Sequence, residues 1–147
     1  MAYAEKADMK SRYGEREINQ LEEGVGTGAI AAALDDAAAE ADSFIAARHS
    51  LPLPAGKKYP ALTWISCDIA RYRLWEGKLK DETDTVYIRY VRARKWLEDL
   101  AAGEVKLLDD AGEEPPLSGE GSSIVVLNRR PQAFSNRVLR KMDYAMD

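Results

Sequence analysis

The stretch from Pro60 to Gly77 constrains the fold most, because apolar side chains surround nearly its whole helical circumference. As a helix, it would carry on one face Leu62, Ile65, Ile69 and Tyr72. Most of the remaining surface would carry Trp64, Ala70, Leu74 and Trp75. A helix that is apolar on all sides is stable when other elements cover it. The sequence therefore predicts a buried helix here, at the centre of the domain.

Three other segments have the pattern of helices. Ala29 to Arg48 places its apolar residues on one face at three- and four-residue steps, and its many alanines let a neighbouring helix approach closely. Thr83 to Ala102 carries a similar stripe and is followed by Gly103, a common helix-ending residue. Glu5 to Glu23 contains Gly14 and predicts two short helices or one broken helix. The prolines of "LPLPAGKKYP" predict a loop before the central helix.

The helical pattern stops at Leu107. The following "DDAGEEPPLSGEG" carries five acids and no base, whereas "RRPQAFSNRVLRK" carries five basic residues and no acid. Between them "SSIVVLN" is a β-branched run of strand length without a partner strand in the chain. We therefore predict an all-α bundle of about four to five helices at residues 1–105, an acidic flexible linker at 106–121, and an extended basic arm at 122–147 that contains one short β-strand.

Composition excludes several classes of protein. The net charge of -4 and the pI near 5.2 do not suit a general polyanion binder. A single cysteine cannot form a disulfide framework, and one histidine cannot supply a Cys/His-rich zinc site. The N-terminal residues show no apolar signal segment, and no apolar window is long enough to span a membrane. We expect synthesis in the cytoplasm and no membrane, metal or cofactor.

The stretch "SCDIARYRLW" brings the only cysteine, Cys67, next to charged residues and invites comparison with an active site. A thiol nucleophile needs a nearby base, and the sequence offers only His49, so burial of Cys67 as a small apolar residue is favoured. Asp68 and Arg71 stand three residues apart on the central helix and predict a structural ion pair, within that helix or to Arg48. The chain is therefore not expected to be an enzyme. The glycines of "GVGTG" follow a helical rather than a strand pattern, which disfavours a dinucleotide site.

Two basic regions are candidates for binding. Arg89, Arg92 and Lys95 lie on one predicted helix, where they form either a solvated face or a contact with an acidic partner or phosphate. The arm mixes apolar and basic residues more than a solvating disordered tail usually does, which favours a segment that folds on a partner. Its candidate contact residues are Ile124, Val125, Val126, Leu127, Arg129, Arg130, Phe134, Arg137 and Arg140. The four aliphatic residues would add a strand to a foreign sheet edge.

Several ordered motifs resemble the Mu-like phage head-to-tail joining family. "MAYAEKADMKSRYGE" resembles its opening, in which an early tyrosine precedes an aspartate-bearing helix that ends in Arg-aromatic-Gly. "ALDDAAAEADSFIAARHSLPL" looks like its second element, with His49 where an aromatic Tyr or Phe is more usual. "CDIARYRLW" looks like its third, and "RRPQAFSNRVLR" is similar to the arginine-bearing end of many members.

This resemblance implies a structural virion protein, an adaptor of the neck that forms a ring, commonly a dodecamer, under the portal and links the DNA-filled head to the tail. It implies as partners the portal, a stopper or tail-completion protein, and further copies of the chain, with genomic DNA passing non-specifically through the lumen. The arm arginines would contact the portal or a neighbouring subunit. Arg89, Arg92 and Lys95 would face a subunit or the DNA channel.

Two other functions remain open from the sequence. A stopper or tail-completion protein would act one layer lower in the neck. A small DNA-binding regulator would use the basic arm, although no helix-turn-helix recognition element is visible. Salt-dependent binding of duplex DNA by the isolated protein would favour the regulator.

Overall fold

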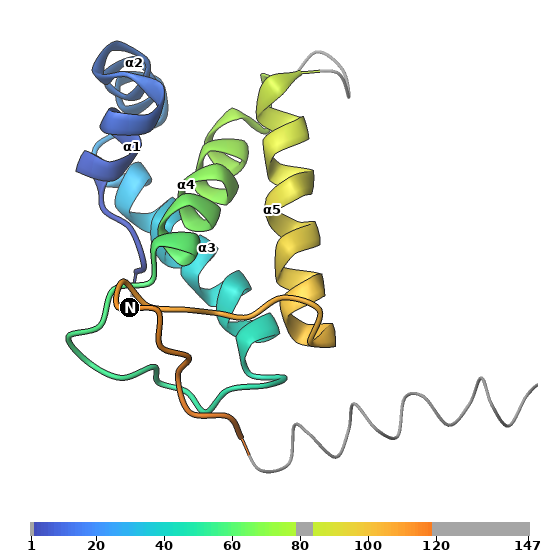
Figure 1. The fold of residues 1–147 in the computed structure, drawn as a ribbon. Helices are drawn as coiled ribbons and strands as arrows, with labels where there is room; N and C mark the ends of the chain where they lie inside the picture. Colours follow the sequence, from blue (N-terminus) through green and yellow to red (C-terminus); the bar gives the residue numbers. More distant parts are fainter. Residues whose placement is uncertain (1, 79–83, 119–147) are drawn as a thin grey trace, which may run out of the picture.

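The computed structural model describes residues 2–78 and 84–118. These residues form five α-helices, namely α1 (Lys6–Tyr13), α2 (Glu15–Val25), α3 (Ala29–Ile45), α4 (Pro60–Trp75) and α5 (Thr85–Ala102). Helices α1 and α2 lie on one side of α4, α5 lies on the other, and α3 runs obliquely across the bundle (Figure 1). The predicted all-α class is confirmed. The predicted strand at 124–127 lies outside the described residues.

Helix α4 is the centre of the bundle, as its composition predicts. It contacts each of the other four helices, with the most extensive contacts to α3 and α5. Its buried residues are Leu62, Ile65, Ser66, Cys67, Asp68, Ile69, Ala70 and Leu74. Two polar residues, Ser66 and Asp68, are thus buried with the apolar ones, and buried polar groups normally need hydrogen-bond partners. Asp68 has one on α1, whereas the Ser66 hydroxyl has none within the described residues.

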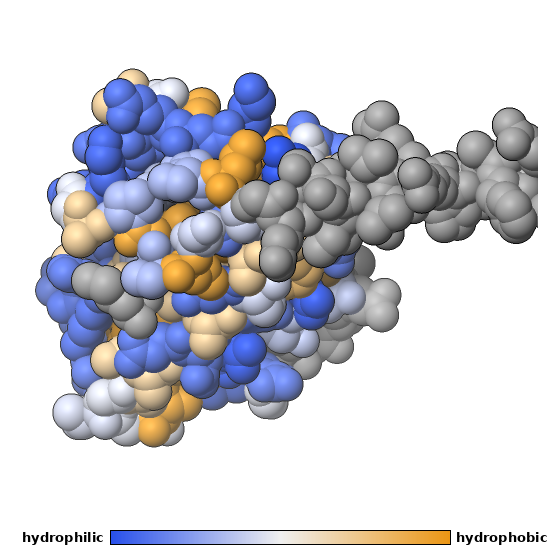
Figure 2. Space-filling model, turned by 90° about the horizontal axis from the view of Figure 1, so that it is seen from below, coloured by the Kyte–Doolittle hydropathy of each residue, from blue (hydrophilic) through white to orange (hydrophobic). Residues whose placement is uncertain are grey.

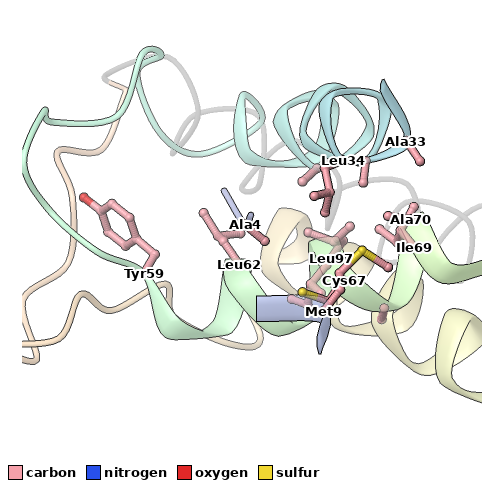
Figure 3. Close-up of a cluster of buried hydrophobic side chains, with 14 of the residues drawn as sticks. Ala4, Met9, Ala33, Leu34, Tyr59, Leu62, Cys67, Ile69, Ala70 and Leu97 are labelled. Carbon is pink, nitrogen blue, oxygen red and sulfur yellow. The ribbon is translucent and has the colours of Figure 1, made fainter. Parts of the chain in front are cut away.

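Side chains from four helices meet in one hydrophobic core. Figure 3 shows Met9 of α1, Leu34 of α3, Cys67 of α4 and Leu97 of α5 in this cluster, and all four are almost completely buried. The buried residues of α3 include four alanines, Ala33, Ala37, Ala38 and Ala41, and such small side chains allow the close approach that the extensive α3–α4 contact requires. The predicted core stripe of α3 is confirmed.

The ends of the helices follow local signals. Gly14, with φ of 96°, separates α1 from α2, so the N-terminal segment forms two short helices. Pro60 is the first residue of α4, where a missing N–H costs no helical hydrogen bond. Asp84 accepts a hydrogen bond from the backbone N–H of Val86 at 2.9 Å and caps α5. Gly103 ends α5 with φ of 83°, and a Cβ there would lie 1.9 Å from the guanidinium of Arg48.

The acidic segment after α5 differs from the flexible linker that the sequence predicts, because residues 106–118 pack against the helical body. Leu107 is fully buried in the core. Lys57 pairs with Asp109 at 3.2 Å, which ties the segment to the loop before α4. Leu117 forms an isolated antiparallel bridge with His49, and the Ser118 N–H donates to the Arg48 carbonyl oxygen at 2.9 Å. The body thus extends at least to Ser118.

Burial predicts very different costs for two similar truncations on α5. Leu97→Ala removes a side chain with no exposed surface and leaves a cavity, so we expect a loss of about 2–5 kcal/mol in the free energy of unfolding. Ile88→Ala removes a side chain of equal size from an exposed position and should cost about 1 kcal/mol or less. Urea unfolding followed by circular dichroism measures both, and equal losses would contradict the assignment of the core.

Candidate functional site

The outward face of α5 combines apolar and basic side chains. Ile88 and Val91 are 39% and 45% exposed, although both are aliphatic. Arg92 and Lys95 are also exposed and follow at helical spacing, which places all four on one side of the helix. The core side of α5 instead carries Val86, Ala93, Leu97 and Leu100. The sequence pattern predicted the two cations as binding candidates but not Ile88 and Val91. These two could have been predicted as exposed, because their spacing places them outside the apolar stripe that faces the core.

The three residues of the predicted basic cluster, Arg89, Arg92 and Lys95, have different neighbours in the structure. The Arg89 guanidinium lies 5.8 Å from the centre of the Tyr13 ring, so it faces α1. Lys95 pairs with Asp99 one turn further along α5, at 2.6 Å. Within the part of the chain that the structure describes, Arg92 forms no salt bridge. Of the three residues, Arg92 is therefore the most available for a partner.

The predicted ion pair between Asp68 and Arg71 is wrong. Arg71 instead binds Glu17 of α2 through two nitrogens, at 2.9 to 3.1 Å. The Trp75 indole N–H donates to the same carboxylate at 3.2 Å. Asp68 accepts a hydrogen bond from the Tyr13 hydroxyl. Tertiary partners from α1 and α2 therefore replace the local pairing, and the arrangement fastens both N-terminal helices to α4.

Burial shifts the pKa values of the two groups in the Tyr13–Asp68 hydrogen bond. Loss of solvent raises the pKa of the Asp68 carboxyl, although the Tyr13 hydroxyl and the cations of Arg89, Arg12 and Arg71 act in the opposite direction. Burial and the hydrogen bond to Asp68 raise the pKa of Tyr13. The contact stabilises the packing of α1 on α4, and nothing in its geometry requires a chemical role.

Cys67 lies in the core. Its side chain is fully buried, and burial raises the pKa of its thiol to about 12. His49 lies just beyond the end of α3, is also buried, and directs Nδ1 toward the carbonyl oxygen of Pro115 at 3.2 Å. Each residue thus has a packing role in the described structure, and a thiol with so high a pKa is a poor nucleophile at neutral pH.

A second surface lies where the loop before α4 meets the segment after α5. Leu51, Leu108 and Leu117 are exposed there by 39% to 50%. Figure 2 shows this lower face, with apolar residues set among hydrophilic ones. The described chain ends on the same face at Ser118, paired with Arg48. The predicted contact residues of the arm, from Ile124 to Arg140, lie outside the described residues.

Within residues 2–78 and 84–118, no three His, Cys, Asp or Glu side chains are placed to hold a metal ion. No helix in those ranges is both long and apolar enough to cross a membrane.

The family model described as bacteriophage Mu, Gp36 matches residues 3–125, which include all five helices. No curated protein matches the chain.

Burial of Cys67 predicts that its thiol is unreactive in the folded protein. We expect the native chain to react with Ellman's reagent much more slowly than the urea-unfolded chain, because both access and the thiolate fraction are low. The variant Ser43→Cys supplies a matched exposed thiol on α3 and should react at once. Equal rates for the two thiols in the folded state would refute the burial of Cys67.

The raised pKa of Asp68 predicts a pH dependence of stability. A carboxyl group whose pKa is higher in the folded state adds stability that is complete below its unfolded pKa and is lost as the pH rises through the folded pKa. The free energy of unfolding of the wild type, relative to Asp68→Asn, should therefore increase as the pH falls from about 7 to about 4. Urea titrations at several pH values measure this difference. Asp36→Asn, an exposed position on α3, is the control, and a difference that does not change with pH would contradict the prediction.

Proposed function

Because the chain belongs to the bacteriophage Mu Gp36 family, we propose that this Mu-like phage protein is a head-to-tail connector. In this role it is a virion protein of the neck, forms a ring under the portal, and links the DNA-filled head to the tail. The single observation that carries the proposal is the family match over residues 3–125. The resemblance of the ordered motifs to head-to-tail joining proteins supplies the specific role.

The shape of the body suits a ring subunit. Closed rings are built from one contact between two different surfaces, repeated around an axis. Helices α1 and α2 present one outer surface and α5 presents another, with α4 between them (Figure 1). The exposed aliphatic residues of α5 provide apolar area of the kind found at subunit interfaces. These features support assembly of copies side by side, and the resemblance to head-to-tail joining proteins implies a dodecamer as the ring.

The arm supplies the proposed contact with the portal. The described chain ends at Ser118 on the lower face, where Leu51, Leu108 and Leu117 are exposed, and residues 122–147 come next in the sequence after Gly121. In our proposal the aliphatic run 124–127 adds a strand to a partner's sheet edge. Charge-assisted hydrogen bonds from the arm then hold acidic portal groups. The residues assigned to those bonds are Arg129, Arg130, Arg137 and Arg140.

Passage of DNA would require only weak contacts with the lumen. Arg92 is exposed and without a salt bridge in the described residues, so it is the candidate for such a contact if α5 borders the channel and not a neighbouring subunit. Such contacts would be independent of sequence and sensitive to salt.

The proposal is tested by co-sedimentation with DNA-filled, tailless heads of the corresponding phage. The full chain should sediment with the heads, and a chain truncated after Gly121 should lose most of this binding, because the truncation removes the arm. The variant Ser43→Cys, altered on the surface of α3, serves as a folded control that should bind like the wild type.

Other outcomes point to the alternative functions. Failure of both full and truncated chains to bind heads would reject the connector role. Binding to heads that already carry a connector would instead favour a stopper or tail-completion protein. Salt-dependent binding of duplex DNA by the isolated chain would favour a DNA-binding regulator.

A further inference from the structure

We propose that the outward face of α5 in one copy docks into an apolar pocket between α1, α2 and α3 of the next copy. The partner is thus a second copy of this chain, bound head to tail. The inference rests on the proposed function only in that a connector ring needs such a repeated contact. It goes further, because it assigns the two surfaces and the residues that meet.

The donor surface is the projecting face of α5. Ile88 and Val91 are spaced by one helical turn and stand away from the core stripe of the helix. Arg92 lies beside Val91 and forms no salt bridge in the described ranges, and Lys95 follows one turn later. Lys95 is partly neutralised by Asp99, so Arg92 is the main free cation. This face therefore presents an aliphatic ridge with positive charge along one edge.

The acceptor surface is a pocket of about 290 Å³ where the N-terminal residues pass over α3. Its apolar lining includes the exposed Ala31 and three core residues that are at most 4% exposed, Ala4, Ile30 and Leu34. This volume is at the lower limit of the roughly 300–1,000 Å³ typical of small-molecule sites, so it suits one or two aliphatic side chains better than a large ligand.

The rim of this pocket is acidic. Glu5, Glu22 and Asp35 contribute to it together with one cation, Lys6. Lys6 pairs with Glu22, which leaves Glu5 and Asp35 outside any salt bridge within the described residues. An apolar pocket with an acidic rim is complementary to an aliphatic ridge edged by Arg92. Such complementarity fixes the register of a contact and excludes wrong partners.

The two surfaces lie on opposite sides of the molecule. Helix α5 packs on α3 and α4, whereas α1 and α2 pack on each other and on the other flank of α4 (Figure 1). One subunit therefore cannot bring its own α5 face to its own pocket. A contact between unlike surfaces of two copies leaves one free surface at each end and continues until a ring closes.

Site-directed cross-linking tests the contact in the full-length chain. Val91→Cys and Ala31→Cys place thiols on the two exposed surfaces, and a short bismaleimide joins thiols that come close. Covalent dimers should form when the two variants are mixed, at a yield several times that of either variant alone. Ser43→Cys, also on α3 but three turns beyond Ala31, is the matched control and should give no such gain with Val91→Cys.

A charge exchange tests the register. Adding Arg92→Glu to Val91→Cys should reduce the dimer yield several-fold, and adding Asp35→Arg to Ala31→Cys should restore it. Dimers from Val91→Cys alone, at the yield of the mixture, would overturn the proposal in favour of a symmetric α5–α5 contact. A yield no higher than that of the Ser43→Cys control would also overturn it. Head binding by the wild type is scored separately: cross-linking without head binding rejects the connector role, and head binding without cross-linking rejects this contact alone.

Discussion

The complete burial of α4 is the constraint on which the rest of the structure depends. This helix is apolar on nearly every side, so α1, α2, α3 and α5 must all cover it, and each of them contacts it. Its buried Asp68 and its half-buried Arg71 and Trp75 bind groups from the covering helices, whereas the hydroxyl of buried Ser66 has no hydrogen-bond partner within the described residues. Tyr13 reaches Asp68, and Glu17 holds both Arg71 and Trp75. Covering one helix therefore also fixes the positions of the others.

Placing α4 at the centre determines which surfaces remain for partners. Helices α1 and α2 lie on one flank and α5 on the other, so the molecule has two unlike sides. The aliphatic residues that α5 does not use against α4 are left facing outward, beside Arg92. A subunit with two unlike sides is suited to a repeating head-to-tail assembly, which is the kind of assembly that a phage connector requires.

Local periodicity explains why the helices could be predicted. The apolar stripes of α3 and α5, the break at Gly14 and the end at Gly103 all follow from neighbouring residues, and the structure confirms them. The predicted ion pair between Asp68 and Arg71 was wrong because each residue binds a partner that is distant in sequence. Tyr13 takes Asp68 and Glu17 takes Arg71. The prediction of a flexible linker was wrong for residues 106–118, because they pack through isolated residues such as the buried Leu107 and show no periodic pattern in the sequence.

The sequence by itself determined the all-α class, the helix positions and the central place of α4, because each depends on spacing within one segment. It also carried the motifs that relate the chain to a phage family. Only the tertiary structure decided which charges pair, that Arg89 turns toward Tyr13 while Arg92 remains exposed, and that an apolar pocket forms between α1, α2 and α3. These features depend on tertiary contacts between segments far apart in the chain. The periodicity of a single segment carries no information about such contacts.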